Sequence, residues 1–195
     1  YTAESQMMTI DLAAPGTLGV EALNLVNTLP AMQFLRLSGK LNADDWSSIK
    51  NMTGLRCIDL TNAQITDIPA NAFSSSSLRF VDLPTCLKTI GEEAFYRRPI
   101  TGKLTLPATL ESIGVNAFRA TYITEVEIPD NVTTIHNHAF AENQKLLTLK
   151  LGTGLTRLNT GSFYDCEALK TVTGGVNVRT IYGDCFKYCA ALETA

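Results

Sequence analysis

Short blocks of alternating apolar and polar residues recur along this chain. Phe34-Leu-Arg-Leu37 and Cys57-Ile-Asp-Leu60 are two of them, and further blocks begin at residues 80, 103, 125, 148 and 171. The second and fourth residues of nearly every block are apolar, a period of two that is typical of a strand with one buried side. We therefore predict short strands that stack in parallel, with the second and fourth residues of each block pointing inward.

A second pattern follows each strand block and ends in a small residue and a phenylalanine. Ile90-Gly-Glu-Glu-Ala94-Phe95 returns as Ile113-Gly-Val-Asn-Ala117-Phe118, and the corresponding phenylalanines stand at positions 73, 95, 118, 140, 163 and 186, which are 22 or 23 residues apart. A fixed period within about 20–29 residues indicates a leucine-rich-repeat solenoid. We predict that the Phe rings stack along it as a spine on the return side.

The period divides the chain into repeats at 34–195 and a cap at 1–33, which together form one elongated domain. In the cap, Met8–Leu12 alternates like a first strand, and a helix is predicted between Thr17 and Pro30. We expect the helix to cover the first repeat with its apolar residues, which are Val20, Leu23, Val26 and Leu29. A second short helix, on the convex side, is predicted over Asn42–Lys50.

At the other end, no capping pattern follows Phe186, so the last repeat is expected to present an open edge. We expect that edge to be available for an end-to-end contact with a partner, a further repeat or a second copy.

Composition excludes some classes of function. The 195 residues are 45% hydrophobic and carry a net charge of -3 without a basic block, so the electrostatic footprint of a nucleic-acid-binding protein is missing. No apolar run approaches the roughly 18 residues expected of a membrane span. Five cysteines leave at least one thiol unpaired within the chain.

The outward positions of the strand blocks form two columns on the face expected to be concave. Their candidate binding residues are Phe34, Arg36, Asp59, Phe80, Asp82, Lys103, Glu125, Glu127 and Lys150. One interpretation is a solvated face with cross-repeat ion pairs such as Arg36–Asp59 and Glu127–Lys150. The other is a binding face on which Phe34 and Phe80 anchor a ligand.

The sequence shows no pattern of residues that indicates a catalytic, cofactor or metal site. His136 and His138 form a His-x-His pair, but no cysteine or carboxylate cluster nearby completes a metal site. No nucleophile, base and oxyanion set can be assembled, so we predict no enzymatic activity, no cofactor and no metal. Cys166 and Cys189 lie 23 residues apart and would stack on adjacent repeats, where both a disulfide and two packed thiols fit.

The repeated Ile-Gly-x-x-Ala-Phe pattern and the segment Thr124-Glu-Val-Glu-Ile-Pro-Asp-Asn-Val-Thr-Thr-Ile135 carry a resemblance over residues 55–195. They resemble the BspA-like leucine-rich repeats of bacterial surface proteins, in which a cysteine often stands at the positions of Cys166 and Cys189. The resemblance implies an α/β solenoid, a right-handed superhelix with a parallel sheet on its concave face. It also implies an extracellular or cell-surface location, no catalysis, and adhesion to host or microbial macromolecules.

The leading hypothesis is therefore a secreted or surface-anchored module that binds a protein or glycan ligand. Two alternatives stay open, a structural spacer within a larger surface protein and a glycan-binding module. The glycan alternative depends on Phe80 and Asp82, where an aromatic ring and a carboxylate lie close on one strand block.

Overall fold

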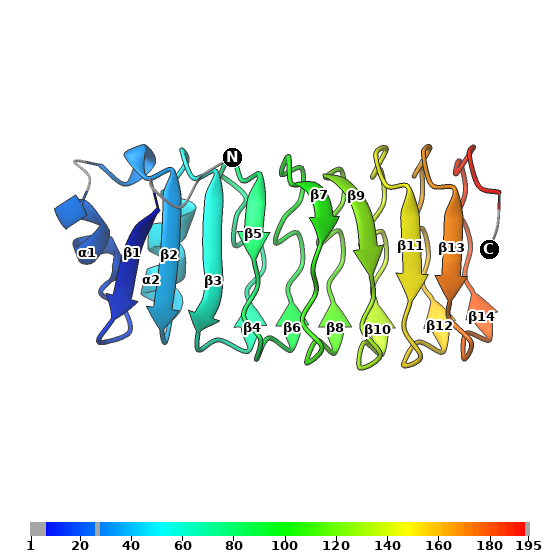
Figure 1. Cartoon of the computed structure of the whole chain (residues 1–195), viewed down its shortest axis with the longest axis horizontal. Coiled ribbons are helices and arrows are strands. Elements are labelled where there is room, and N and C mark those ends of the chain that lie inside the picture. The colour runs from blue at the N-terminus through cyan, green and yellow to red at the C-terminus, as the bar shows by residue number, and fades with distance from the viewer. Residues whose placement is uncertain (1–6, 26–27, 194–195) are drawn as a thin grey trace.

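The computed structural model describes residues 7–25 and 28–193 of the chain. The chain winds into an elongated solenoid in which each repeat adds one long strand, and from residue 67 onward each repeat also adds one short strand near one edge (Figure 1). Every pair of neighbouring strands is parallel. The leucine-rich-repeat solenoid predicted from the sequence is confirmed.

The long strands form two sheets that follow one another along the solenoid. The first contains β1 (Met8–Leu12), β2 (Phe34–Gly39), β3 (Cys57–Ala63) and β5 (Phe80–Asp82). The second contains β7 (Thr101–Leu104), β9 (Tyr122–Glu127), β11 (Thr148–Leu151) and β13 (Thr171–Gly174). Each predicted strand block thus contributes a strand, and the alternating segment Met8–Leu12 pairs with β2 as a first strand. The division into a cap at 1–33 and repeats at 34–195 stays a prediction.

The two sheets separate between β5 and β7. The Thr101 amide still donates to the Arg79 carbonyl at 3.1 Å, but Gly102 then adopts a φ of 82° and the register of β7 against β9 shifts between Gly102 and Lys103. A bulge of this kind bends a strand and interrupts regular pairing. The division of the long strands therefore coincides with this irregularity.

Short strands line the return side and place one buried apolar residue inward in each repeat except the last, where Ile181 is exposed. β4 (Asp67–Ile68), β6 (Thr89–Ile90), β8 (Ser112–Ile113) and β10 (Thr134–Ile135) form one sheet, and β12 (Arg157–Leu158) pairs with β14 (Thr180–Ile181). Between the long and short strands lies the predicted spine. Its successive rings are stacked with centroids 4.9–5.5 Å apart and interplanar angles of 6–15°. The five rings from Phe73 to Phe163 are fully buried.

A polar position follows the spine in each repeat, three residues after the phenylalanine, and we call it the ladder position. Its buried members are Ser76, Thr121, Asn143 and Cys166. Each makes a hydrogen bond, as when the Ser76 hydroxyl donates to the Phe73 carbonyl at 3.0 Å. No buried side-chain nitrogen or oxygen of the described residues lacks a partner, so the ladder satisfies backbone groups that the spine keeps from water.

Helices cover the N-terminal repeats. α2 (Ala43–Lys50), the second predicted helix, lies behind β2 and β3, and Asn42 caps it, with its side chain accepting from the backbone amides of Asp44 and Asp45. Trp46 of this helix is buried and meets the Phe73 ring edge-on, with centroids 6.0 Å apart. Trp46 therefore has a structural role, because it extends the row of packed aromatic rings toward the N-terminus.

The predicted buried side of the first helix is wrong for Val20 and Leu23. α1 (Leu18–Leu25) buries Leu18 and Ala22 while Val20 and Leu23 are exposed, and Leu29, in the short η2 (Leu29–Ala31) that follows, is partly buried against the core. Gly19 lies where α1 meets α2, since a Cβ there would lie 2.8 Å from the Ser48 hydroxyl oxygen. Val26 lies outside the described residues.

Candidate binding surface

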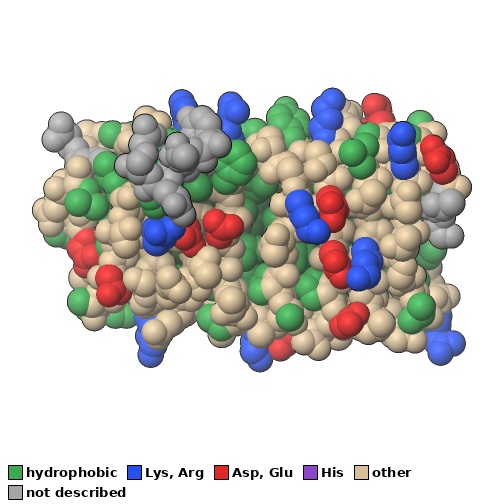
Figure 2. Space-filling view, in the orientation of Figure 1, with side chains coloured by type: hydrophobic (Ala, Val, Ile, Leu, Met, Phe, Trp, Pro, Cys, Tyr) green, Lys and Arg blue, Asp and Glu red, His purple; other side chains and the backbone are tan. Residues whose placement is uncertain are grey.

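The outward side chains of the long strands lie on one side of the solenoid, which we call the strand face (Figure 2). In the first sheet, register places Phe34 beside Cys57 and Cys57 beside Phe80, and it places Arg36, Asp59 and Asp82 in the neighbouring column. In the second sheet, Lys103 lies beside Glu125 and Lys150 beside Glu127. All candidate residues lie on the strand face, but the break between β5 and β7 divides them into two groups.

The first group has an aromatic column with an exposed ring at its end. Phe80 is 50% exposed, Phe34 is half-buried, and Cys57 between them is only 6% exposed. Burial, and then the charges of Asp82 and Asp59, raise the pKa of the Cys57 thiol. Cys57 is therefore a neutral packing residue at neutral pH and supports the apolar character of this column.

Beside it, two carboxylates have unequal surroundings. Arg36 Nε donates to Asp59 at 2.6 Å, as the cross-repeat pairing predicted, and the Thr61 amide donates to the same carboxylate at 3.0 Å. Burial alone would raise the pKa of Asp59, but the hydrogen bonds from Thr61 and Arg36 outweigh it and lower that pKa. Asp82 makes no hydrogen bond or ion pair with a described residue. Partial desolvation, and then repulsion by Asp59, raise its pKa.

We expect Asp82→Asn to raise the free energy of unfolding at pH 7 by less than about 1 kcal/mol. The folded-state pKa of Asp82 is raised, so its ionised form destabilises the fold above that pKa, and this cost disappears as the pH falls. Urea unfolding at pH 7 and at pH 3 measures the effect, which should vanish at pH 3. Asp59→Asn should show the opposite sign at pH 7, because the lowered pKa of Asp59 marks a stabilising carboxylate. A destabilised Asp82→Asn variant at pH 7 would contradict this account.

The second group consists of two ion pairs on adjacent strands. Lys103 pairs with Glu125 at 2.6 Å and Lys150 with the predicted partner Glu127 at 2.5 Å, and all four side chains are largely exposed. The hydrogen bond and charge of the partner carboxylate raise the pKa of each lysine. Such exposed pairs contribute little stability, but they hold their charges at defined points on the face.

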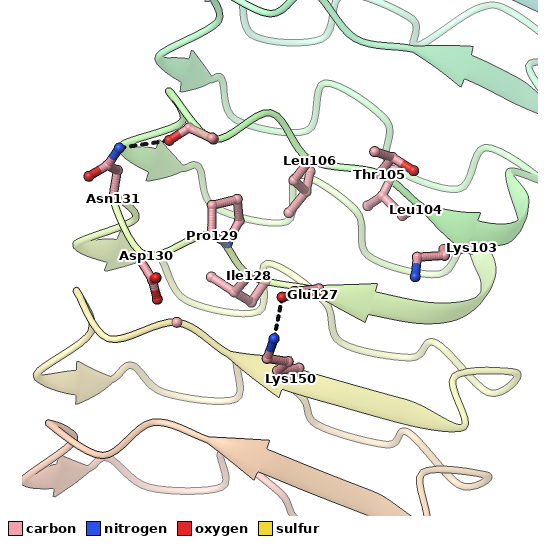
Figure 3. A pocket seen from close by; sticks show the side chains of 12 residues that line it. Lys103, Leu104, Thr105, Leu106, Glu127, Ile128, Pro129, Asp130, Asn131 and Lys150 are labelled. Carbon is pink, nitrogen blue, oxygen red and sulfur yellow. Dashed lines mark hydrogen bonds and ion pairs between the residues drawn. The ribbon is translucent and has the colours of Figure 1, made fainter.

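A groove opens beside these ion pairs (Figure 3). It was not predicted from the sequence. It has a volume of ≈ 510 Å³, and Leu104, Leu106, Ile128 and Pro129 line it, with the Lys150–Glu127 pair along one side. It forms because the pairing of β7 with β9 ends at Leu104, so the segments that follow the two strands separate. The prolines that come directly after the strand blocks mark this position in the sequence, since proline cannot donate to a strand ladder.

Possible metal ligands do not cluster within the part of the chain that the structure describes. Among the described residues, no group of three or more His, Cys, Asp or Glu side chains could hold a metal ion, and no helix is long and apolar enough to cross a membrane. Cys166 and Cys189 are thiols, and they donate to the carbonyls of Phe140 at 3.3 Å and Phe163 at 3.2 Å. The contact with Cys189, and then burial, raise the pKa of Cys166, so this thiol is a packing group and not a nucleophile.

Comparison with solved structures finds similar solenoids in bacterial proteins. A leucine-rich repeat protein from Bacteroides ovatus is 28% identical, with a TM-score of 0.70, over 80% of this chain and 40% of that protein. The Treponema pallidum leucine-rich repeat protein is 22% identical, with a TM-score of 0.68, over 84% of this chain and 73% of that protein, and supports the fold alone. This chain therefore spans well under half the length of the Bacteroides ovatus protein. Among curated proteins, none matches the chain in sequence.

Family comparison agrees with the resemblance found in the repeats. The family model of the BspA type leucine rich repeat region matches residues 45–193 with 6 copies. The match begins before the predicted limit at residue 55 and includes most of α2. Repeat proteins of this kind are in general protein-interaction modules and are typically not enzymes. The chain belongs to the BspA type leucine rich repeat family.

Proposed function

We propose that this chain is a secreted or cell-surface module that mediates adhesion by binding a host or microbial protein through the strand face. The family membership supports a protein-interaction role and a place at the cell surface. The single observation that carries the proposal is Phe80, a half-exposed aromatic ring on a face whose other outward side chains are mostly polar or charged.

An exposed ring of this kind can supply much of the affinity of an interface. Burying it in a partner removes a large apolar surface from water, and aromatic residues are enriched among the residues that dominate binding energy. Asp82 lies on the same side of β5, two residues further on, and is available to a donor of the partner. The paired charges Lys103, Glu125, Glu127 and Lys150 would form a polar rim, while Phe34, Arg36 and Asp59 would extend the contact toward β2.

Binding of the purified chain to a panel of extracellular-matrix proteins and glycans tests the proposal. Phe34→Ser/Phe80→Ser should weaken saturable binding by at least about 30-fold, the loss expected when an anchor worth about 2 kcal/mol is removed. Val20→Ser/Leu23→Ser is the matched control, because it removes two exposed apolar side chains from α1 and leaves the strand face intact. Equal binding by the Phe variant and the wild type, with the fold intact by circular dichroism, would move the site away from the strand face.

Two other functions have an observation in their favour. A glycan ligand would stack on the Phe80 ring and bond to Asp82, and the glycans of the same panel distinguish it from a protein ligand. A structural spacer would contact neighbouring repeats or a second copy end to end, and the apolar side chains available for that contact include Val176, Ile181 and Tyr188, all exposed. An absence of binding to any member of the panel would favour the spacer.

A further inference from the structure

A second pocket lies away from the strand face, at the edge where the long strands begin. Basic side chains show along this edge above β2 to β5 (Figure 2). The pocket has a volume of ≈ 480 Å³, and Arg56, Arg79 and Arg98 all line it. No aspartate or glutamate is among its described lining residues, although the chain as a whole has a net charge of -3. Three guanidinium groups thus surround a pocket without a carboxylate to balance them.

Arg56 and Arg79 occupy the same position in successive repeats. Each immediately precedes a long strand, and the Arg79 amide donates to the Arg56 carbonyl at 2.8 Å. Both are exposed, and neither forms an ion pair with a described residue. Like charges opposite each other on neighbouring strands destabilise a sheet. The strand face differs, because Arg36, Lys103 and Lys150 all have a carboxylate on the adjacent strand.

Arg98 is unusual in a different way, since it occupies the ladder position. The buried members of this position are small and uncharged, whereas Arg98 places a half-buried guanidinium there. Its Nε donates to the Tyr96 carbonyl at 3.0 Å, and its Nη1 donates to the Ser76 carbonyl. These bonds fix the orientation of the group and leave its remaining N–H donors for a ligand.

We propose that Arg56, Arg79 and Arg98 form a binding site for a sugar that carries a sulfate or phosphate ester. Guanidinium groups bind tetrahedral oxyanions through paired N–H donors, and a pre-oriented arginine loses less entropy in doing so. The rest of the pocket favours a sugar over an apolar group, because Gln33 and Ser77 supply an amide and a hydroxyl group to its wall. Its volume lies in the range of small-ligand sites.

The site is independent of the proposed role of Phe80, since the two use different surfaces. A module that binds protein through the strand face could hold a charged glycan at this edge at the same time. The Phe34→Ser/Phe80→Ser variant should therefore bind ester-bearing sugars as the wild type does. A loss of ester binding in that variant would mean that the strand face is the glycan site and would overturn the assignment to the arginines.

Titration of the full chain at about 150 mM salt, followed by NMR or calorimetry, provides the test. Glucosamine 6-sulfate and glucose 6-phosphate should bind saturably, with glucosamine and glucose at least about 10-fold weaker, and the two esters compared directly identify the preferred anion. Arg56→Gln/Arg79→Gln should weaken ester binding at least about 10-fold. The matched control is Arg157→Gln/Arg179→Gln, which removes the same charge from two exposed arginines elsewhere and should change affinity less than about twofold.

Several results would overturn the proposal. These are no saturable binding of either ester, equal binding of esters and unmodified sugars, and equal losses in the two double variants. Preference for a phosphoserine peptide over both sugar esters would also overturn it, in favour of a phosphopeptide site. Arg98→Ala would leave the carbonyls of Ser76 and Tyr96 without their donor, so Arg98→Lys is the better variant. Arg98→Lys keeps the positive charge but loses the paired N–H donors of the guanidinium group. Ester binding should therefore weaken while the circular dichroism spectrum is unchanged.

Discussion

Phe118→Ala is expected to lower the free energy of unfolding by about 3–5 kcal/mol. The Phe118 ring is fully buried between two others, with centroids 4.9 Å from Phe95 and 5.3 Å from Phe140 and near-parallel planes. Truncation to alanine removes contacts on both faces of the ring and leaves a cavity that the neighbouring repeats cannot fill without moving. Domains are typically stable by only about 5–15 kcal/mol, so the loss would be a large share of the total.

Equilibrium unfolding in urea, followed by circular dichroism and fluorescence together, measures this loss and shows whether the solenoid unfolds in one step. Two variants of the same chemistry serve as controls. Phe186→Ala should cost clearly less, because that ring is only half-buried and stacks on Phe163 alone among the described residues. Phe80→Ala should cost about 1 kcal/mol or less, since its ring is half in water. Similar losses in all three variants would show that the spine is not the centre of the fold.

The spine and the strands could be predicted because the residues that form them recur in the sequence at a nearly constant spacing. A position that recurs every 22 or 23 residues is stacked on its own equivalent, so the environment of Phe118 is already implied by Phe95 and Phe140. The ion pairs Arg36–Asp59 and Lys150–Glu127 could be predicted for the same reason, since both join equivalent or nearly equivalent positions of adjacent repeats.

Other features depend on contacts that do not repeat. The buried side of α1 depends on its packing against α2, where Gly19 approaches Ser48 closely, and no periodicity of α1 itself reveals that contact. The break in the long sheets depends on the φ of Gly102, and the groove beside the Lys150–Glu127 pair depends on where pairing with β7 ends. Each of these features departs from the average repeat. A periodic sequence pattern predicts only what recurs in every repeat, so it does not predict them.

The arginine pocket lies between these two cases. Arg56 and Arg79 share one repeat position, so their proximity was visible in the sequence as two basic residues directly before successive strand blocks. Arg98 belongs to a different position, and only the winding of the chain brings it to the same pocket. A search for a contiguous basic block misses such a site, because the solenoid gathers charges that lie about one repeat apart.

Asn143→Leu is expected to lower the free energy of unfolding by about 2–4 kcal/mol, through the ladder position. The fully buried Asn143 amide donates to the carbonyls of Phe118 and Phe140, both at 2.8 Å, and its oxygen accepts from the Thr121 hydroxyl. Leucine has a similar size but leaves the Phe118 carbonyl and the Thr121 hydroxyl without their partner, while the Phe140 carbonyl keeps only the Cys166 thiol as a donor. Each unsatisfied group costs about 1–3 kcal/mol before any apolar gain. Urea unfolding beside the wild type measures the loss.

The next repeat supplies the control for this prediction. Cys166 stands at the same position one repeat later, and its thiol donates to the carbonyl of Phe140, the spine residue of the preceding repeat. Asn143→Cys should therefore keep a donor for the Phe118 carbonyl and lose less stability than Asn143→Leu. Thr121→Val added to Asn143→Leu should recover part of the loss, because it removes one of the unsatisfied groups. An Asn143→Leu variant with the same free energy of unfolding as the wild type would contradict this account. It would show that side chains at the ladder position only fill space, and that the hydrogen bonds of Arg98 at that position do not explain its presence there.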